Sequence, residues 1–199
     1  MERRAADRRA SNERWRSILA GATEVFRREG FLRTRLEDVA AEVGINRASL
    51  YYYVGTKEEL LIALVEEPAR EMTRHCREAL DSEVPADVKL RTALRSFVDD
   101  LQKYPELFLL FSESQHIGGI TDAEGISRNA QEYVDTLLAI IEEGIDAGVF
   151  RSDLDPGLVM HGVLGMFNWI HMWYVPHGRH SLTEIGDAFA EMIFSGLRS

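Results

Sequence analysis

The side chains best suited to contact nucleic acid lie in one short segment, residues 46–57. Arg47 can donate to O6 and N7 of a guanine or to a phosphate, and Tyr51 and Tyr52 can meet thymine methyl groups and phosphate oxygens. Lys57 begins the following helix, where it can clamp a phosphate together with free backbone amides. These residue types predict an interface with double-stranded DNA.

The expected elements around this segment describe a helix-turn-helix. A short helix is expected to follow Thr34, with Gly44 ending it, and Asn46 can cap a second helix that runs through Tyr53. Ala48 and Ser49 keep the start of the second helix narrow enough for a major groove. On its back, Leu50 and Val54 can anchor it to the scaffold.

Helical spacing of apolar residues extends over nearly the whole chain, and the alternation expected of strands is almost absent. We therefore expect an all-α fold of about nine helices. Three capping boxes are predicted, at Thr34–Glu37, Thr56–Glu59 and Ser181–Glu184. The helices expected after the helix-turn-helix span residues 57–80, 86–104, 105–114, 122–147, 157–175 and 182–197, with a loop at Gly118-Gly119.

Composition narrows the class of protein. Hydrophobic residues make up 45% of the 199 residues and charged residues 28%, which is ordinary for a globular protein. A lone cysteine, Cys76, excludes a disulfide framework, and no apolar signal segment follows Met1, so we expect a cytoplasmic protein. The apolar run 158–175 contains His161, Asn168 and His171, which favours a buried helix over a membrane span.

Charge is divided unevenly along the chain, although the total is −10. Residues 1–57 carry 12 basic and 8 acidic side chains, a net charge of +4, whereas residues 58–199 carry 11 and 25, a net charge of −14. A basic front with an acidic remainder accompanies many nucleic-acid modules. We predict a DNA-binding domain with an N-terminal arm at residues 1–57 and a larger helical domain at residues 58–199.

The stretch from Trp15 to Val65 resembles the DNA-binding domain of TetR-type transcriptional regulators. The matching features are Thr34, Asp38-Val39-Ala40, Gly44, Leu50-Tyr51-Tyr52-Tyr53 and Thr56-Lys57-Glu58-Glu59-Leu60-Leu61. The resemblance implies a homodimer of all-α subunits, with a divergent ligand-binding and dimerisation domain behind the DNA-binding one. The residues expected at DNA are Arg35, Asn46, Arg47, Ala48, Ser49, Tyr51, Tyr52, Tyr53 and Lys57. Glu37 departs from the family, since relatives can carry a basic residue there.

Two features of this front part have alternative interpretations. One of the three consecutive tyrosines can pack in the core, since one helix face alone can turn toward DNA. Near the N-terminus, Arg3, Arg4, Arg8 and Arg9 can form either a solvated disordered tail or an arm that contacts phosphates or a minor groove.

His161, Asn168 and His171 form a polar stripe on the predicted helix 157–175. Their polar groups must find hydrogen-bond partners in a dimer partner, a ligand or buried water. The small residues Gly162 and Gly165 permit close approach, so we expect this helix and the last one to form a dimer interface. The segment from Asn168 to Leu197 is similar to the C-terminus of TetR-type regulators that sense acyl-CoA thioesters. The resemblance implies a small-molecule effector, with no resident cofactor.

An acyl chain needs an apolar tunnel, its pantetheine amides need buried polar partners, and its phosphates need cations. The residues expected to line such a site are Phe108, Phe111, Arg128, Met166, Asn168, Trp169, Trp173 and Arg179. Each aromatic residue in this set can instead be plain core. His116, His177 and His180 lack the spacing of a metal site, so no metal is expected.

We therefore expect a ligand-responsive homodimeric repressor of a palindromic operator, released by an acyl-CoA and controlling lipid, steroid or organic-acid catabolism. The alternative is a repressor of a drug-efflux gene, which acidic pocket residues would favour. An enzyme is not expected, because the sequence has no glycine-rich phosphate loop, G-x-S-x-G elbow or paired metal motif. A sequence-indifferent architectural DNA binder is a further alternative.

Overall fold

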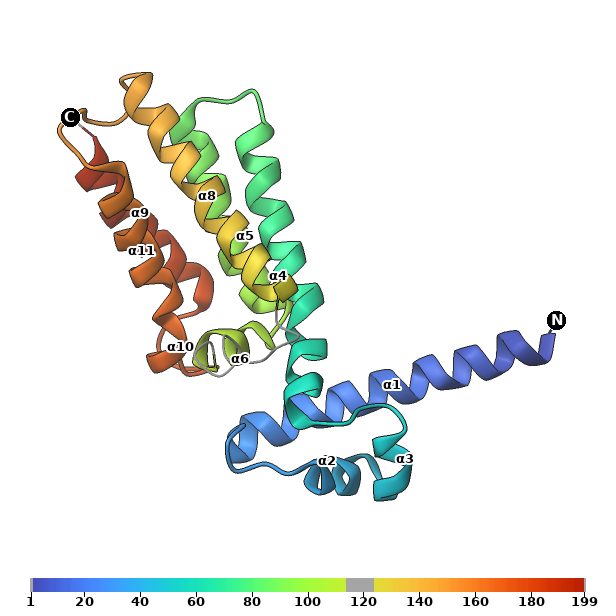
Figure 1. Ribbon diagram of the computed structural model, residues 1–199. Coiled ribbons are helices and arrows are strands. Elements are labelled where there is room, and N and C mark those ends of the chain that lie inside the picture. The colour runs from blue at the N-terminus through green and yellow to red at the C-terminus, as the bar shows by residue number, and fades with distance from the viewer. Residues whose placement is uncertain (1, 114–123, 199) are drawn as a thin grey trace.

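The computed structural model describes residues 2–113 and 124–198, the first ten of them by their backbone alone. In these ranges the chain is helical and contains no strand, so the predicted all-α fold is confirmed (Figure 1). The helices are α1 (Glu2–Glu29), α2 (Leu36–Val43), α3 (Arg47–Tyr51), α4 (Lys57–Asp81), α5 (Ala86–Lys103), α6 (Leu107–Ser112), α8 (Glu124–Asp146), α9 (Pro156–Asn168), α10 (Ile170–Trp173) and α11 (Leu182–Leu197).

Helix α4 connects two hydrophobic cores (Figure 1). Its first turns, with Leu61 and Val65, pack into a small core with α1, α2 and α3. From Met72 onward, the same helix packs against α5 and α8 in the larger core, which α9 and α11 complete. A division of the chain at residue 57 stays a prediction, since α4 contributes to both cores.

Helix α1 extends back to Glu2, well beyond the small core (Figure 1). The interpretation of the first residues as a disordered tail is therefore wrong, and the backbone there is helical. At the other end, Gly30 ends α1 with a φ of 80°, in the left-handed region that favours glycine.

The start of α2 differs from the predicted capping box. The Thr34 hydroxyl donates to the carbonyl of Gly30 at 2.9 Å, and Arg35, not Thr34, occupies the N-cap position. Instead, the backbone amide of Arg35 donates to the Asp38 carboxylate at 2.8 Å, and α2 begins at Leu36. At the end of α2, Gly44 has a φ of 70°, as a tight turn requires.

The caps of α3 and α4 follow the predicted residues with two differences. Asn46 caps α3 by accepting from the Ser49 amide at 2.8 Å, but α3 ends at Tyr51 and not at Tyr53. Thr56 caps α4 by accepting from the Glu59 amide at 3.0 Å. The Glu59 carboxylate accepts from the Gly55 amide, one residue earlier than a capping box requires.

The predicted single helix 157–175 is wrong, because the helix is interrupted at Trp169 and ends at Trp173. The His171 ring donates from Nδ1 to the carbonyl of Asn168 at 2.6 Å. In a continuous helix that carbonyl would accept from the amide of Met172, which bonds Trp169 instead. The side-chain bond therefore accompanies the break.

Helix α11 begins with the predicted capping box. The Ser181 hydroxyl accepts from the Glu184 amide at 3.2 Å, and the Glu184 carboxylate accepts from the Ser181 amide at 2.8 Å. No helix in the described part of the chain is both long and apolar enough to cross a membrane. The predicted loop at Gly118-Gly119 and the first two residues of the predicted helix 122–147 lie outside the described residues.

Candidate nucleic-acid interface and internal cavity

Helix α3 is anchored on one side and exposed on the other. Leu50 is fully buried and Val54 nearly so, which confirms both as the predicted anchors of this helix. The opposite side presents Arg47, Ala48, Ser49 and Tyr51 to solvent, and Tyr52, just after the helix, is 84% exposed. The side chain of Asn46 is used in the cap, and Arg35 is exposed at the start of α2.

Arg47 is held by two neighbours before any DNA is present. Its Nε lies 3.0 Å from the Glu37 carboxylate of α2, and its guanidinium lies 5.1 Å from the centre of the Tyr51 ring. The Tyr51 hydroxyl accepts a long hydrogen bond from the same guanidinium, at 3.4 Å. This bond and the Glu37 charge raise the pKa of Arg47, so it stays protonated. Glu37 therefore orients the candidate base-reading residue.

The three consecutive tyrosines separate into two exposed residues and one packed residue. Tyr53 is half-buried, and its ring stacks on Trp15 of α1 with centroids 6.2 Å apart and an interplanar angle of 14°. Tyr52 meets the edge of Tyr53 at 5.4 Å and points to solvent. Tyr51 and Tyr52 are therefore the ones free to meet DNA.

Lys57 has a different position from the one expected of a phosphate clamp. Its Nζ donates to the carbonyls of Phe31, Leu32 and Thr34 at 2.8, 3.1 and 3.2 Å. The same ammonium lies 4.6 Å from the centre of the Phe31 ring. All three of its donors are thus directed at the loop between α1 and α2, where they fix α4 to that loop.

A cavity of about 250 Å³ lies in the C-terminal bundle, between α4, α6, α8 and α9. Of the residues expected around an effector, Phe111 and Asn168 line it. Sequence reasoning missed the α4 and α8 residues of its wall, among them Thr73, which is a polar residue within the buried stripe of α4. The other lining residues are Ala69, Met72, Leu110, Ile126, Ser127, Asn129, Ala130, Tyr133, Val134 and Leu164.

The polar groups of the cavity wall are hydroxyls and amides. The Thr73 hydroxyl lies 3.0 Å from the carbonyl of Ala69 and 3.2 Å from that of Asn129, a residue of α8. Burial raises the pKa of Tyr133, which therefore stays a neutral phenol. Within the described residues, neither a carboxylate nor a cationic side chain lines this cavity. It is suited to a neutral, largely apolar group.

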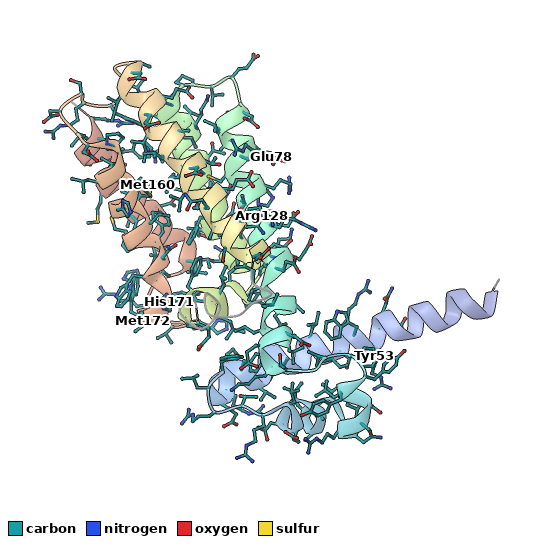
Figure 2. The ribbon with its side chains drawn as sticks, viewed as in Figure 1. Tyr53, Glu78, Arg128, Met160, His171 and Met172 are labelled. Atoms are coloured by element: carbon teal, nitrogen blue, oxygen red, sulfur yellow. The ribbon has the colours of Figure 1, made fainter. Side chains whose placement is uncertain are left out.

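The remaining candidates lie elsewhere. Phe108 stacks on Tyr174 at 5.8 Å and lines a second cavity, of about 430 Å³, between α1, α5 and α6. Met166 is half-buried against the large core. Arg128 is exposed on α8 (Figure 2) and does not line the first cavity, and Arg179 is exposed in the loop before α11.

Trp169 and Trp173 belong to an exposed apolar face and do not line the first cavity. The face also includes the exposed side chains Leu158 of α9, Met172 of α10, Val175 just after α10, and Met192 of α11. Met172 is labelled in Figure 2 at the end of the bundle nearest the small core. Exposed apolar residues gathered on neighbouring helices mark an interaction surface.

Of the three histidines considered as metal ligands, the structure describes two, His177 and His180. In the parts of the chain that it describes, no group of three His, Cys, Asp or Glu side chains could hold a metal ion. His177 and His180 are exposed in the loop before α11, and His116 lies outside the described residues.

Comparison with protein families finds two matches. Residues 18–64 match the model described as bacterial regulatory proteins of the tetR family, and residues 83–197 match the Tetracyclin repressor-like C-terminal domain. The first match takes in α2, α3 and the first turns of α4, and the second takes in α5 to α11, while residues 65–82 lie between them.

Individual relatives cover most of the chain at low identity. The Fatty acid metabolism regulator protein of Bacillus subtilis is 20% identical over 94% of this chain and 96% of its own. The transcriptional repressor KstR2 of Mycobacterium tuberculosis is 22% identical over 94% of both chains. The KstR2 structure, described as a ketosteroid transcriptional regulator, superposes with a TM-score of 0.86 at 21% identity, covering 94% of this chain and 95% of that one.

A second similar structure was solved with two bound molecules. It is AibR in complex with isovaleryl coenzyme A and operator DNA. Its TM-score is 0.79 at 24% identity, and the superposition covers 91% of this chain and 98% of that one. At this level of identity, the likeness shows a shared fold.

Proposed function

The chain belongs to the TetR family of bacterial regulatory proteins, and we propose that it is a homodimeric repressor that an acyl-CoA thioester releases from a palindromic operator. Its target genes would serve the catabolism of lipids, steroids or organic acids. The observation that carries this proposal is that α4 connects two sites. Its first turns pack in the same core as α3, which exposes Arg47, and its middle residues line an apolar cavity.

Helix α4 is the element through which the two sites would communicate. Its first residue, Lys57, is bonded to the loop that precedes α2, and its middle residues Ala69, Met72 and Thr73 line the cavity. An effector that fits the cavity better in one orientation of α4 would shift the population toward that orientation. The separation of the two α3 helices in a dimer would then no longer match successive major grooves, about 34–36 Å apart.

An acyl group is the effector that the cavity chemistry supports. The wall is apolar, with amide and hydroxyl groups from Asn129, Asn168 and Thr73 that can bond a thioester carbonyl or a pantetheine amide. Three similar proteins are described as a fatty acid metabolism regulator, a ketosteroid transcriptional regulator and a complex with isovaleryl coenzyme A. Arg128, the cation expected at the phosphates of coenzyme A, is exposed on α8 and does not line the cavity.

Binding assays with matched ligands test this proposal. Thermal shifts would be measured with coenzyme A alone, isovaleryl-CoA, octanoyl-CoA and a steroid acyl-CoA, and with ethidium as a cationic drug. We expect stabilisation by at least one acyl-CoA at concentrations that leave the protein unaffected by free coenzyme A. A duplex selected from genomic DNA should dissociate when the same thioester is added.

Three results would contradict this assignment. Stabilisation by ethidium and by none of the thioesters would favour the efflux repressor, although no carboxylate lines the cavity in the described residues. Steady release of free coenzyme A thiol from the stabilising thioester would indicate an enzyme. Equal affinity for the selected and the random duplex would indicate an architectural DNA-binding protein that does not read sequence.

A further inference from the structure

A recess of about 300 Å³ lies between α1 and α3, on the side of α3 away from Arg47. Its walls are Arg14, Ile45, Ser49, Tyr52 and Tyr53. We propose that this recess holds a phosphate group of the DNA backbone and that Arg14 supplies its positive charge. The inference rests on the proposed DNA-binding function, and it adds to that function a residue of α1 that the sequence did not single out.

The charge of Arg14 is available, unlike that of two arginines at the other end of α1. Arg27 pairs with Glu24 at 2.7 Å, and Arg28 pairs with Glu29 and Glu42, each at 3.0 Å. By contrast, no carboxylate among the described residues lies within ion-pair distance of Arg14, which is exposed. Arg14 can therefore exchange water for a phosphate without first breaking an ion pair among those residues.

Neighbouring contacts fix Arg14 relative to α3. Trp15, the next residue of α1, stacks on Tyr53 at 6.2 Å, and Tyr53 in turn meets Tyr52 at 5.4 Å. Figure 2 labels Tyr53 where α1 passes the end of α3. This aromatic contact places the base of the Arg14 side chain beside the exposed flank of α3, and so the recess does not depend on a flexible arm.

The other polar groups of the recess complete a phosphate site. None of the hydrogen bonds in the described part of the chain uses the hydroxyl of Ser49 or of Tyr52, and both residues are exposed. Two hydroxyls and a guanidinium can donate to phosphate oxygens from different directions. The recess walls contain no acidic residue that would repel a phosphate.

The position of the recess favours the DNA backbone over the bases. At about 100° of rotation per residue, Ala48 and Tyr52 lie on the side of α3 opposite the buried Leu50. Arg47 and Tyr51 are on one flank, toward α2, while Ser49 is on the other flank, toward α1. When a helix lies in a major groove, its flanks face the two phosphate backbones. The α1 flank, with Arg14, would meet one of them.

The test compares Arg14→Ala with Arg16→Ala, a matched variant of a second exposed arginine of α1 that does not line the recess. Affinities for the selected duplex and for a random duplex would be measured by fluorescence anisotropy between about 50 and 200 mM salt. We expect Arg14→Ala to weaken both affinities by about tenfold and to reduce the salt slope by about one, since one phosphate contact is lost. Arg16→Ala should leave both the affinities and the slope unchanged.

Two further variants separate charge from folding. Arg14→Lys should keep most of the salt slope, and Tyr52→Phe should weaken both duplexes by a smaller factor with no change in slope, provided that melting temperatures are unaltered. An Arg14→Ala variant with the wild-type salt slope would overturn the proposed phosphate site in the recess and would not contradict the proposed repressor function. Equal losses in Arg14→Ala and Arg16→Ala would also overturn it. Failure of the wild type to bind any duplex would reject both proposals.

Discussion

The carboxylate of Glu37 orients the side chain of Arg47, and its negative charge would lie close to bound DNA. In the free protein, Glu37 lies 3.0 Å from the guanidinium, and the Tyr51 ring lies on its other side. The Arg47 side chain is 67% exposed and the Glu37 side chain 42%, so solvent screens the pair and it adds little to stability. Its consequence concerns recognition, because a held arginine loses less conformational freedom when it bonds a guanine.

Substitution of Arg47 and substitution of Glu37 should therefore change DNA recognition in different ways. Arg47→Ala should cost roughly 1–3 kcal/mol on the selected duplex and little on a random one, because a base contact is lost. Glu37→Gln should raise affinity for the random duplex, because a negative charge near the backbone is removed. Anisotropy titrations of both variants and of Arg95→Ala, an exposed arginine of α5, would measure this. Unchanged discrimination in Arg47→Ala would reject its role as a base reader.

Cys76 illustrates a residue whose chemistry is suppressed by its surroundings. The side chain is 1% exposed, and burial raises the pKa of its thiol to about 12 from an ordinary value of 9.0. The reactive thiolate is therefore scarce in the folded protein at neutral pH. Such a thiol gives no support to the enzyme alternative.

The shifted thiol also has a consequence for stability. Because the folded pKa is raised, the unfolded chain loses this proton first, and the thiol contributes stability below pH 9.0 that is lost as the pH rises toward about 12. The difference in unfolding free energy between wild type and Cys76→Ala should therefore shrink as the pH is raised from about 8 to 10 in urea titrations. Iodoacetamide should label Cys76 in urea and spare it in the native state. Rapid native labelling would contradict the assigned pKa.

Among the elements, α4 is the one on which the effector response depends. Its Ala69 is 3% exposed and lines the cavity, whereas Ala63, also on α4, does not. A larger side chain at residue 69 would occupy space that an acyl chain needs. No residue of α3 lines this cavity, so the α3 surface should remain intact.

Ala69→Leu should accordingly reduce the thermal shift produced by the stabilising acyl-CoA by several-fold. Overpacking costs typically about 1–3 kcal/mol, so the melting temperature without ligand should fall moderately. Operator affinity should persist, and the thioester should no longer release the duplex. Ala63→Leu serves as the control for a larger residue on the same helix. A full thermal shift in Ala69→Leu would place the effector outside this cavity.

Element by element, apolar periodicity predicted most of the helices, and hydrogen bonds of single side chains account for the differences. The caps of α3 and α11 follow from Asn46 and Ser181, whose short side chains can reach the next turn. The break at Trp169 could not be predicted, because it accompanies a bond between the His171 ring and a backbone carbonyl within an apolar run. Apolar periodicity indicates which residues are buried, but it does not show which donor, a side chain or a backbone amide, will bond a given carbonyl.

The candidate sites were predictable to different degrees, according to how far apart in the sequence their residues lie. Residues of α3 are local in sequence, so their common surface follows from one short helix. Lys57 was expected at a phosphate, but three carbonyls more than twenty residues earlier in the chain accept its donors. The cavity wall combines Thr73, Tyr133 and Asn168 from three helices, and only the packing of α4, α8 and α9 brings them together.

At the scale of the whole molecule, charge and apolar surface are separated. The first 57 residues carry +4 and contain the exposed α3, while the remainder carries −14. An acidic body repels the DNA backbone and favours approach through the basic part. The body nevertheless exposes apolar side chains on α9, α10 and α11, where Leu158 is 74% and Met192 63% exposed. That face is the proposed dimer interface.

Close approach of a second copy at this face is sterically possible. Gly162 and Gly165 of α9 are exposed, and a Cβ atom added at either would meet nothing within 4 Å. Small residues between larger apolar ones allow two helices to approach and the larger side chains to interdigitate. Met192→Arg should therefore disrupt the dimer, because it would bury an unpaired charge in the interface.

Sedimentation equilibrium of Met192→Arg and of Val88→Arg would test this expectation. Val88 is an exposed apolar residue at the start of α5, outside the proposed interface, so its variant should stay dimeric. Met192→Arg should shift toward monomer and lose operator affinity by roughly 10²–10⁴-fold, because each half-site would then be bound independently. Its affinity for a single half-site should remain, since α3 is untouched. A Met192→Arg protein that stays dimeric with full operator affinity would place the interface on another surface.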